Sequence, residues 1–363
     1  MDGPIRERII VRHFGSRVGV AGGGGVASVI ATHADLPYVV VRPVFVTTSH
    51  LGARLYSGQH VPGAVVALAR AVRKAPRSVA HVHLAGGGSL VREGGIVRIA
   101  RRLGVPTVVT VHASDLADAA RDHSARLRAV LRAAHVVHAL GASSARILHD
   151  VGGADLVVVV IPNCVIAPTQ VTDAGGNPPV ALFAGEQSLR KGLDVLIAAW
   201  PSVRAAVPDA RLVIAGNERD FSVPPTAGVE VIGPVRREHV ADALQHCRVA
   251  VLPSRMEAQP MFLLEAMATA RPVVATAIAE IPGTLADHTG LVAPDDPEAL
   301  ARALIVFLGD ADRATRSGND ERDHVMRTHA PAQIARAFEA AYELALRSAS
   351  QPSDRTGQSS NGA

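Results

Sequence analysis

The sequence predicts an α/β protein with two domains, each a parallel β-sheet covered by helices. Three observations support this fold class. The chain has 363 residues, which is long for one domain. Apolar, β-branched runs alternate with Ala- and Leu-rich segments of helical spacing, a rhythm typical of parallel sheets. Aromatic residues make up only 3% of the chain, so Val, Leu, Ile and Ala must fill the core, as they do in buried parallel strands.

The first domain is expected over residues 1–165. Helical spacing is found at 62–74 and 97–104, between runs rich in Val and Ile. These runs predict strands at 9–14, 37–46, 79–84, 106–112, 135–140 and 156–162. The segment NCVIAPTQVTDAGGNPP that follows has no periodicity and is rich in Pro and Gly, so we expect an interdomain linker over 166–179.

The same rhythm restarts in a second domain, expected over residues 180–330. The predicted elements are strands at 180–185, 210–216, 229–235, 249–254 and 272–276, with helices at 192–203, 239–247 and 261–270. Both domains are therefore expected to be Rossmann-like.

The C-terminal region predicts a closing helix followed by a disordered tail. Ile334, Phe338 and Tyr342 recur every four residues, which is typical of an amphipathic helix. We expect this helix over 331–346, packing back towards the first domain. Residues 347–363 are too polar to pack and are predicted to be disordered.

Composition points to the cytoplasm. Cys164 and Cys247 are far apart and have no metal-ligand spacing, which fits a reducing compartment without a disulfide framework. The N-terminal segment MDGPIRERIIVRHFG lacks an apolar stretch long enough for a signal peptide or a membrane span.

Charge is unevenly distributed along the chain. Residues 1–165 contain 19 Lys and Arg against 9 Asp and Glu, whereas the remainder contains 18 against 24. A basic first half favours an anionic partner, such as a phospholipid surface or a phosphorylated acceptor. An Arg-rich solvated surface explains the pattern equally well. Nucleic acid is disfavoured because aromatic residues are not interleaved with the basic ones.

The segment SRMEAQPMFLLEAMA places two carboxylates, Glu257 and Glu265, in an apolar run. Unpaired buried charges are costly, so each must reach water or bind a partner. Pro260 is tolerated in a first helical turn. A helix starting there would present the amides of Met261, Phe262 and Leu263 to an anion such as a diphosphate. The alternative is two surface acids on an amphipathic helix.

A second segment, FAGEQSLRKGLDVL, places Arg190 and Lys191 in the turn after a strand. An open α/β sheet binds ligands at that end of its strands. Only Lys74 and Lys191 are lysines, against 35 arginines, so a lysine here indicates a need for a compact ammonium. Chance retention of a lysine is the alternative.

Two weaker patterns lie in the first domain. The run VAGGGGVASVI, with Gly24 and Gly25, would let a backbone approach a phosphate, although a flexible loop is as good an interpretation. His112 follows a strand in TVHASDL, at the usual edge of a cleft, although a lone His is more often structural. We expect His81 and His83, in HVHL, to belong to the strand itself.

Taken together, these motifs resemble the retaining glycosyltransferases of the GT-B fold, family four, also called group 1. The resemblance is strongest over 180–300, where the motifs FAG…RKGLDVL, LVIAG, VEVIGPV, LPSRMEAQPMFLLEAMA, RPVVAT, EIPG and TGLVAPDDPEAL follow in the family's order. It is fainter in the first half, where IPNCV stands in place of the usual Asn-Gly-Val.

The resemblance implies transfer of a sugar from a nucleotide-sugar donor bound between the domains, with retention and without a metal or cofactor. Glu265 would hold the ribose, and Glu257 the donor sugar. Lys191, with Arg190, would neutralise the diphosphate. The remaining implied contacts are His112 beside the anomeric carbon, the amides of Met261, Phe262 and Leu263 at diphosphate or sugar hydroxyls, backbone near Gly233 at the base, and Gly24–Gly25 at the donor phosphates.

The chain departs from the family pattern at Glu186, where Arg is common, and at Ala258 and Ala270, where Gly is commoner. An acid pointing inward at 186 would repel a diphosphate. Two alternatives to an active transferase therefore stay open: a catalytically silent GT-B protein that binds a nucleotide sugar or stabilises a partner, and a GT-B-like sugar-nucleotide epimerase. The expected acceptor is a cell-envelope glycan, a glycolipid or a small glycoside.

Overall fold

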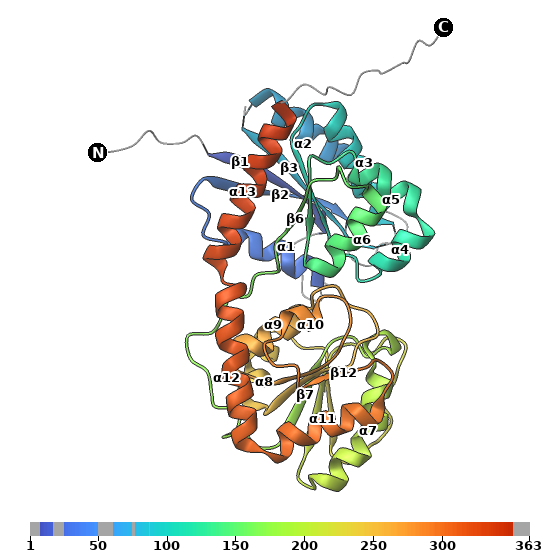
Figure 1. Cartoon of the computed structure of the whole chain (residues 1–363), viewed down its shortest axis with the longest axis vertical. Helices are drawn as coiled ribbons and strands as arrows, with labels where there is room; N and C mark the ends of the chain where they lie inside the picture. Colours follow the sequence, from blue (N-terminus) through green and yellow to red (C-terminus); the bar gives the residue numbers. More distant parts are fainter. Residues whose placement is uncertain (1–7, 17–24, 50–60, 75–76, 87, 351–363) are drawn as a thin grey trace, which may run out of the picture.

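A computed structural model describes residues 8–16, 25–49, 61–74, 77–86 and 88–350, and it contains two lobes (Figure 1). The first lobe holds a six-stranded parallel sheet of order β2-β1-β3-β4-β5-β6. Its strands are β1 (Ile9–Ser16), β2 (Val41–Ser49), β3 (Ser78–Leu84), β4 (Thr107–Val111), β5 (Val136–Ala139) and β6 (Val158–Val160). Its helices are α1 (Gly25–Asp35), α2 (Val61–Lys74), α3 (Ser89–Arg102), α4 (Leu116–Asp122), α5 (Ser124–Leu131) and α6 (Ala142–Gly152).

The second lobe holds another six-stranded parallel sheet, of order β12-β11-β10-β7-β8-β9. Its strands are β7 (Val180–Ala184), β8 (Arg211–Ala215), β9 (Val229–Gly233), β10 (Val249–Leu252), β11 (Val273–Thr276) and β12 (Leu291–Val292). Its helices are the short η1 (Leu189–Lys191), α7 (Leu193–Ala206), α8 (Arg237–His246), α9 (Met261–Ala268), α10 (Ile281–Thr284), α11 (Pro297–Gly309) and α12 (Ala311–Thr328).

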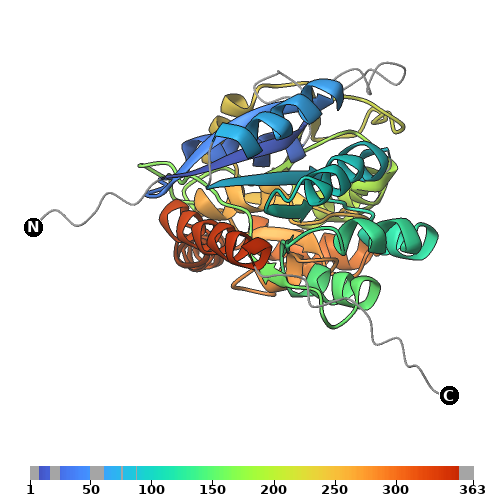
Figure 2. The same ribbon diagram turned by 90° about the horizontal axis from the view of Figure 1, so that it is seen from above.

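The apolar side chains of the first sheet pack into two cores, one on each face. Helices α2, α3, α5 and α6 contribute to one core. The other contains Leu36, the residue after α1, together with Ile334, Phe338 and Tyr342 of the last helix, α13 (Pro331–Ser350). Figure 1 shows α12 and α13 running in succession from the second lobe to the first, and Figure 2 shows α13, in red, along one side of the molecule.

Helix α13 corrects the predicted start of the disordered tail. The prediction of disorder from residue 347 is wrong for 347–350, which continue the helix to Ser350. Arg347 and Ala349 are good helix formers, no Gly or Pro interrupts 347–350, and the Ser350 hydroxyl donates to the Leu346 carbonyl within the last turn. Residues 351–363 lie outside the described residues.

The expected linker, 166–179, contains no helix or strand and lies against the second domain. The fully buried Arg271 donates to the Cys247 carbonyl (2.8 Å) and to the Thr172 hydroxyl (2.8 Å), which ties the linker to that domain. Among the described residues, no helix is both long enough and apolar enough to cross a bilayer.

Candidate functional site

Both sheets have a topological switch point, and the candidate site lies beside these points. In the second sheet β7 lies between β8 and β10, so the loops after β7 and β10 leave the sheet side by side. The first loop carries Arg190 and Lys191, and the second carries Glu257. Ligands of open α/β sheets bind at the carboxyl ends of strands where the order reverses.

A cavity of about 270 Å³ lies between the two domains, beside these loops. It is lined by Val26, Val29, His112, Ser114, Leu140, Asn163, Arg190, Lys191, Glu257, Ala258, Gln259, Pro260, Met261 and Phe262. The sequence-predicted residues His112, Lys191, Arg190, Glu257, Met261 and Phe262 therefore meet at one cavity.

Lys191 and Glu257 form an ion pair inside this cavity. The Lys191 Nζ lies 2.5 Å from the Glu257 Oε1, and the same oxygen accepts from the Ser254 hydroxyl at 2.8 Å. The two side chains are only 15% and 8% exposed. A paired, hydrogen-bonded carboxylate resolves why an acid occurs in this apolar run.

Glu186, the acid found where the family commonly has Arg, is paired with two arginines. Its Oε2 accepts from Arg190 at 3.2 Å and from Arg219 at 3.0 Å. Burial opposes ionisation of Glu186, but the two arginines outweigh it and lower the pKa of this carboxyl. Arg190 also donates to the Met256 carbonyl, so its guanidinium is shared between Glu186 and the loop after β10.

Helix α9 points its N-terminus at the cavity. Pro260 is the residue immediately before the helix, with φ −73° and ψ 130°, rather than a member of its first turn. Met261 and Phe262 line the cavity, whereas the Leu263 side chain is fully buried in the core. First-turn amides have no acceptor within their helix, so this end suits an anion.

Glu265 and Gly233 are not among the residues that line the cavity. The Glu265 Oε1 accepts from Arg237, at 2.8 Å from Nε and 2.7 Å from Nη2. Burial raises the pKa of Glu265, and the charge of Arg237 opposes that rise. Gly233 ends β9 with a φ of 69°, and its carbonyl accepts from the Gly216 amide.

His112 follows β4 and is 7% exposed. Burial, with a smaller contribution from His138, lowers the pKa of His112 to about 3, so its imidazole is neutral at physiological pH. Its Nε2 lies 2.9 Å from the Nδ1 of His83. His83 belongs to β3, as expected, and its ring meets that of His112, which follows the neighbouring parallel strand β4. Gly25 begins α1, and Gly24 lies outside the described residues.

Sequence reasoning missed two contacts that join the domains. The Gln259 Oε1 accepts from the Asn163 amide (2.6 Å), and the Gln259 carbonyl accepts from the Asn163 side chain (2.9 Å). The Glu280 carboxylate accepts from the amides of Ser143 (3.2 Å) and Ser144 (2.6 Å), at the N-terminus of α6 in the other domain. Acids at helix N-termini are frequent, but no local pattern identifies a helix elsewhere in the chain.

Because Glu280 caps a helix of the opposite domain, Glu280→Ala should lower stability by about 1 kcal/mol, as the loss of a helix cap does. It should also change the arrangement of the domains, seen as a larger radius of gyration in small-angle X-ray scattering. Asp310→Ala is the matched control, since Asp310 caps α12 within one domain. An unchanged radius of gyration in Glu280→Ala would show that this contact does not hold the domains together.

A second cavity, of about 320 Å³, adjoins the first. Both cavities share Ser114, Leu140, Glu257 and Ala258. The second extends along α4 and α6 of the first domain, where Asp115, Asp118, Ser143 and Ser144 line it, and reaches Arg255 and Glu280 in the second domain. Two ligands could therefore meet next to Glu257.

Comparisons with known proteins agree with this architecture. A "Glycosyl transferases group 1" profile matches residues 178–310, and a "Glycosyl transferase 4-like domain" profile matches residues 17–164. Among solved structures, sucrose-phosphate synthase from Thermosynechococcus elongatus has a TM-score of 0.67 at 19% identity, covering 93% of this chain and 98% of that one. Anabaena Alr3699/HepE in complex with UDP has a TM-score of 0.67 at 15% identity, covering 92% and 100%.

Curated relatives match over shorter stretches. A GDP-mannose-dependent monoacylated α-(1-6)-phosphatidylinositol monomannoside mannosyltransferase of Corynebacterium glutamicum is 32% identical over 150 residues, covering 38% of this chain and 39% of the relative. A D-inositol 3-phosphate glycosyltransferase of Corynebacterium kroppenstedtii is 30% identical over 202 residues, covering 50% and 44%. The matched regions thus span less than half of the length of these relatives. The two family profiles nevertheless match one domain each, and the solved structures share both domains: the chain belongs to the group 1 glycosyltransferases and has their two-domain GT-B fold.

Proposed function

We propose that this protein is a retaining glycosyltransferase that moves a sugar from a nucleotide-sugar donor to an acceptor. One observation carries the proposal: a single cavity between the domains brings together Lys191, Glu257, His112 and the N-terminus of α9. These groups come from both sheets, at the edges where α/β proteins bind ligands. Their chemistry matches the parts of a nucleotide sugar, with cations and amides for a diphosphate and a carboxylate for sugar hydroxyls.

In this proposal the protein stabilises the leaving diphosphate with its own positive groups. As the bond between the sugar and the diphosphate breaks, negative charge grows on the diphosphate oxygens. Lys191, Arg190 and the first-turn amides of α9 lie at the same cavity and would bind that charge, without a metal or cofactor. Lys191 would leave Glu257 as the donor binds, and the released carboxylate would accept from hydroxyls of the sugar.

Retention requires the acceptor oxygen to attack the face that the diphosphate leaves, with the acceptor proton passing to the departing diphosphate oxygen. The second cavity, which shares Glu257 with the first, is our proposed acceptor site. Relatives are named for inositol phosphate and phosphatidylinositol mannoside acceptors. We propose a phosphorylated polyol or a glycolipid for this chain, reached by a cytoplasmic enzyme at a membrane surface through its basic first half.

Glu265 is proposed to hold the ribose of the donor, beyond the diphosphate along α9. Glu265→Ala should weaken binding of the matching nucleoside diphosphate by about 1.5–3 kcal/mol, the value of a hydrogen bond to a charged group. Titration calorimetry with UDP, GDP and ADP measures these affinities and identifies the nucleobase of the donor. Glu298→Ala is the control, because that side chain is 88% exposed on α11. Equal affinities in wild type and Glu265→Ala would remove Glu265 from the site.

A silent nucleotide-sugar-binding protein is the second candidate, and the pairing of Glu186 with Arg190 favours it, because this pairing occupies a cation of the site. Release of nucleoside diphosphate from the donor in the presence of inositol phosphates or phosphatidylinositol vesicles distinguishes the two functions. Release that depends on one of these acceptors supports a glycosyltransferase. Tight donor binding with no release from any of these mixtures supports the silent protein, and release without acceptor supports an epimerase or a hydrolase.

A further inference from the structure

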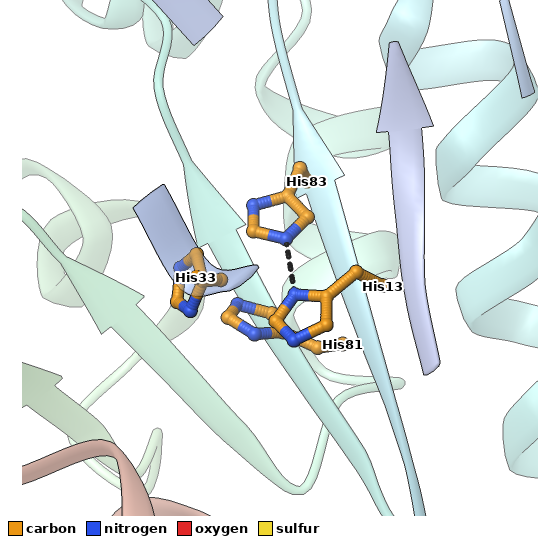
Figure 3. Close-up of side chains that lie close together, drawn as sticks. All are labelled: His13, His33, His81 and His83. Atoms are coloured by element: carbon orange, nitrogen blue, oxygen red, sulfur yellow. Dashed lines mark hydrogen bonds between the residues drawn. The ribbon is translucent and has the colours of Figure 1, made fainter. Parts of the chain in front are cut away.

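Four buried histidines gather inside the first domain, next to the candidate site. This histidine quartet consists of His13 on β1, His33 on α1, and His81 and His83 on β3, and Figure 3 shows the four rings close together. Each is at most 3% exposed. One ring nitrogen from each residue lies within 4.8 Å of those of the other three.

The topology of the sheet explains why residues so far apart in sequence meet. Strands β1 and β3 are neighbours at the switch point of the first sheet, with His13 paired to His81 in register. His83 follows His81 by two residues and therefore points to the same face. His33 reaches this face from α1, which packs against β1. Three elements thus bring one nitrogen from each of four imidazoles within 4.8 Å of the others.

The rings are in the protonation state that binds metal ions. Burial lowers the pKa of His13 to about 3 and holds the pKa values of His33, His81 and His83 well below the ordinary range. Each neutral imidazole has one nitrogen lone pair to donate. The Nε2 of His13 is buried and has no hydrogen-bond partner among the described residues. An orphaned buried nitrogen in a cluster of lone pairs calls for a ligand.

Three of the four histidines already have, at their outer nitrogen, a partner of the kind that holds a metal ligand in place. The Nδ1 of His33 contacts the Tyr38 hydroxyl at 2.8 Å, and the Nδ1 of His81 contacts the Tyr342 hydroxyl at 2.9 Å. The Nδ1 of His83 contacts His112. Metal-bound histidines usually engage their second nitrogen in this way, which leaves Nε2 for the ion.

We propose that the histidine quartet binds one transition-metal ion of the zinc type, through the Nε2 atoms of His33, His81 and His83 and one nitrogen of His13. Four imidazoles without a carboxylate suit Zn²⁺, Co²⁺ or Ni²⁺ and do not suit Mg²⁺ or Ca²⁺. Binding replaces two present contacts: the 3.0 Å contact of His13 with His83, and the 2.6 Å contact of His81 with Thr110. Thr110 keeps its contact with His138.

The ion would also determine how His112 presents its proton to the cleft. A metal on the Nε2 of His83 leaves the His83 proton on Nδ1, from which it donates to the Nε2 of His112. His112 must then carry its own proton on Nδ1 and act as a donor through that atom. His83 is thus a positioning residue for a ring that lines the proposed donor cavity. The metal would not touch the diphosphate and would act on the donor cavity only through the orientation and proton of His112.

The first test measures metal in the full chain, prepared without an affinity tag and without chelators. We expect about one equivalent of metal per chain by elemental analysis, and one Co²⁺ per stripped chain with the absorption spectrum of a tetrahedral site. The readout is metal binding, so it stands whether or not the protein transfers sugar. A folded wild-type chain that retains no metal and binds neither Zn²⁺ nor Co²⁺ in competition with a chromophoric chelator overturns the proposal.

Variants locate the ion. His13→Gln and His33→Gln should lose stoichiometric binding, and Tyr342→Phe, which removes an outer partner, should weaken Zn²⁺ affinity about 10- to 100-fold. His138→Gln is the matched control, because His138 is equally buried but bonds to the Ile161 carbonyl and lies outside the quartet. Equal affinity in His13→Gln and His138→Gln places any bound metal elsewhere and refutes the site.

Discussion

Replacing Lys191 by Met should lower the rate of sugar transfer about 100- to 1,000-fold, the usual loss when one group that stabilises transition-state charge is removed. Lys191 is the ammonium at the cavity, 2.5 Å from Glu257, and Met has a similar length without charge. The charge that develops on the leaving diphosphate exceeds that of the bound donor, so turnover should fall more than donor affinity. Initial rates of nucleoside diphosphate release, with affinities from calorimetry, measure both quantities.

Stability must be separated from catalysis in this variant, because Lys191→Met leaves Glu257 buried without its cation. The cost of an unpaired buried charge should appear as a lower melting temperature. The double variant Lys191→Met/Glu257→Gln removes both charges and should recover that stability while remaining slow. Arg302→Met, at a cation that is 68% exposed on α11, should change neither quantity. A folded Lys191→Met enzyme with wild-type turnover would contradict the role of Lys191.

Among Gly→Ala substitutions in the loop that carries Lys191, Gly192→Ala should destabilise the folded protein most. Gly192 has a φ of 67°, and a Cβ atom there would lie 1.8 Å from the Pro253 carbonyl oxygen. The left-handed conformation alone costs an L-residue about 1–2 kcal/mol, and the clash with backbone adds to it. The loops after β7 and β10 must then move apart. We expect the free energy of unfolding, measured by urea denaturation, to fall by more than about 2 kcal/mol.

The control for this variant is Gly95→Ala in α3. A Cβ at Gly95 meets no atom within 4 Å. An alanine inside a helix should stabilise the protein by about 0.5–1 kcal/mol. Opposite signs for the two substitutions would attribute the effect of Gly192→Ala to its backbone conformation. Equal and small effects would mean that the turn before α7 can relax, and the geometry of Lys191 would not depend on Gly192.

Much of this architecture follows from local patterns in the chain. The alternation of strands and helices identified both sheets, and the family motifs placed Lys191 and Glu257 together although they are 66 residues apart. The histidine quartet could not be found in that way. His13, His33 and His81 have no common spacing, and only the order of strands in the sheet brings them together. The contact of Glu280 with the N-terminus of α6, across the domain boundary, was missed for the same reason.

The chain passes between the domains twice, after Asn163 and again before Pro331, and these two passages are hydrogen-bonded to each other through the Val165 amide and the His329 carbonyl, 3.2 Å apart. Two covalent connections side by side leave the domains little freedom to slide or separate. The motion that remains is rotation about the paired passages, in the manner of a hinge with a single axis. In the proposed transferase, donor entry and product release are therefore expected to follow one angular coordinate, which a pair of labels on opposite sides of the cleft can measure.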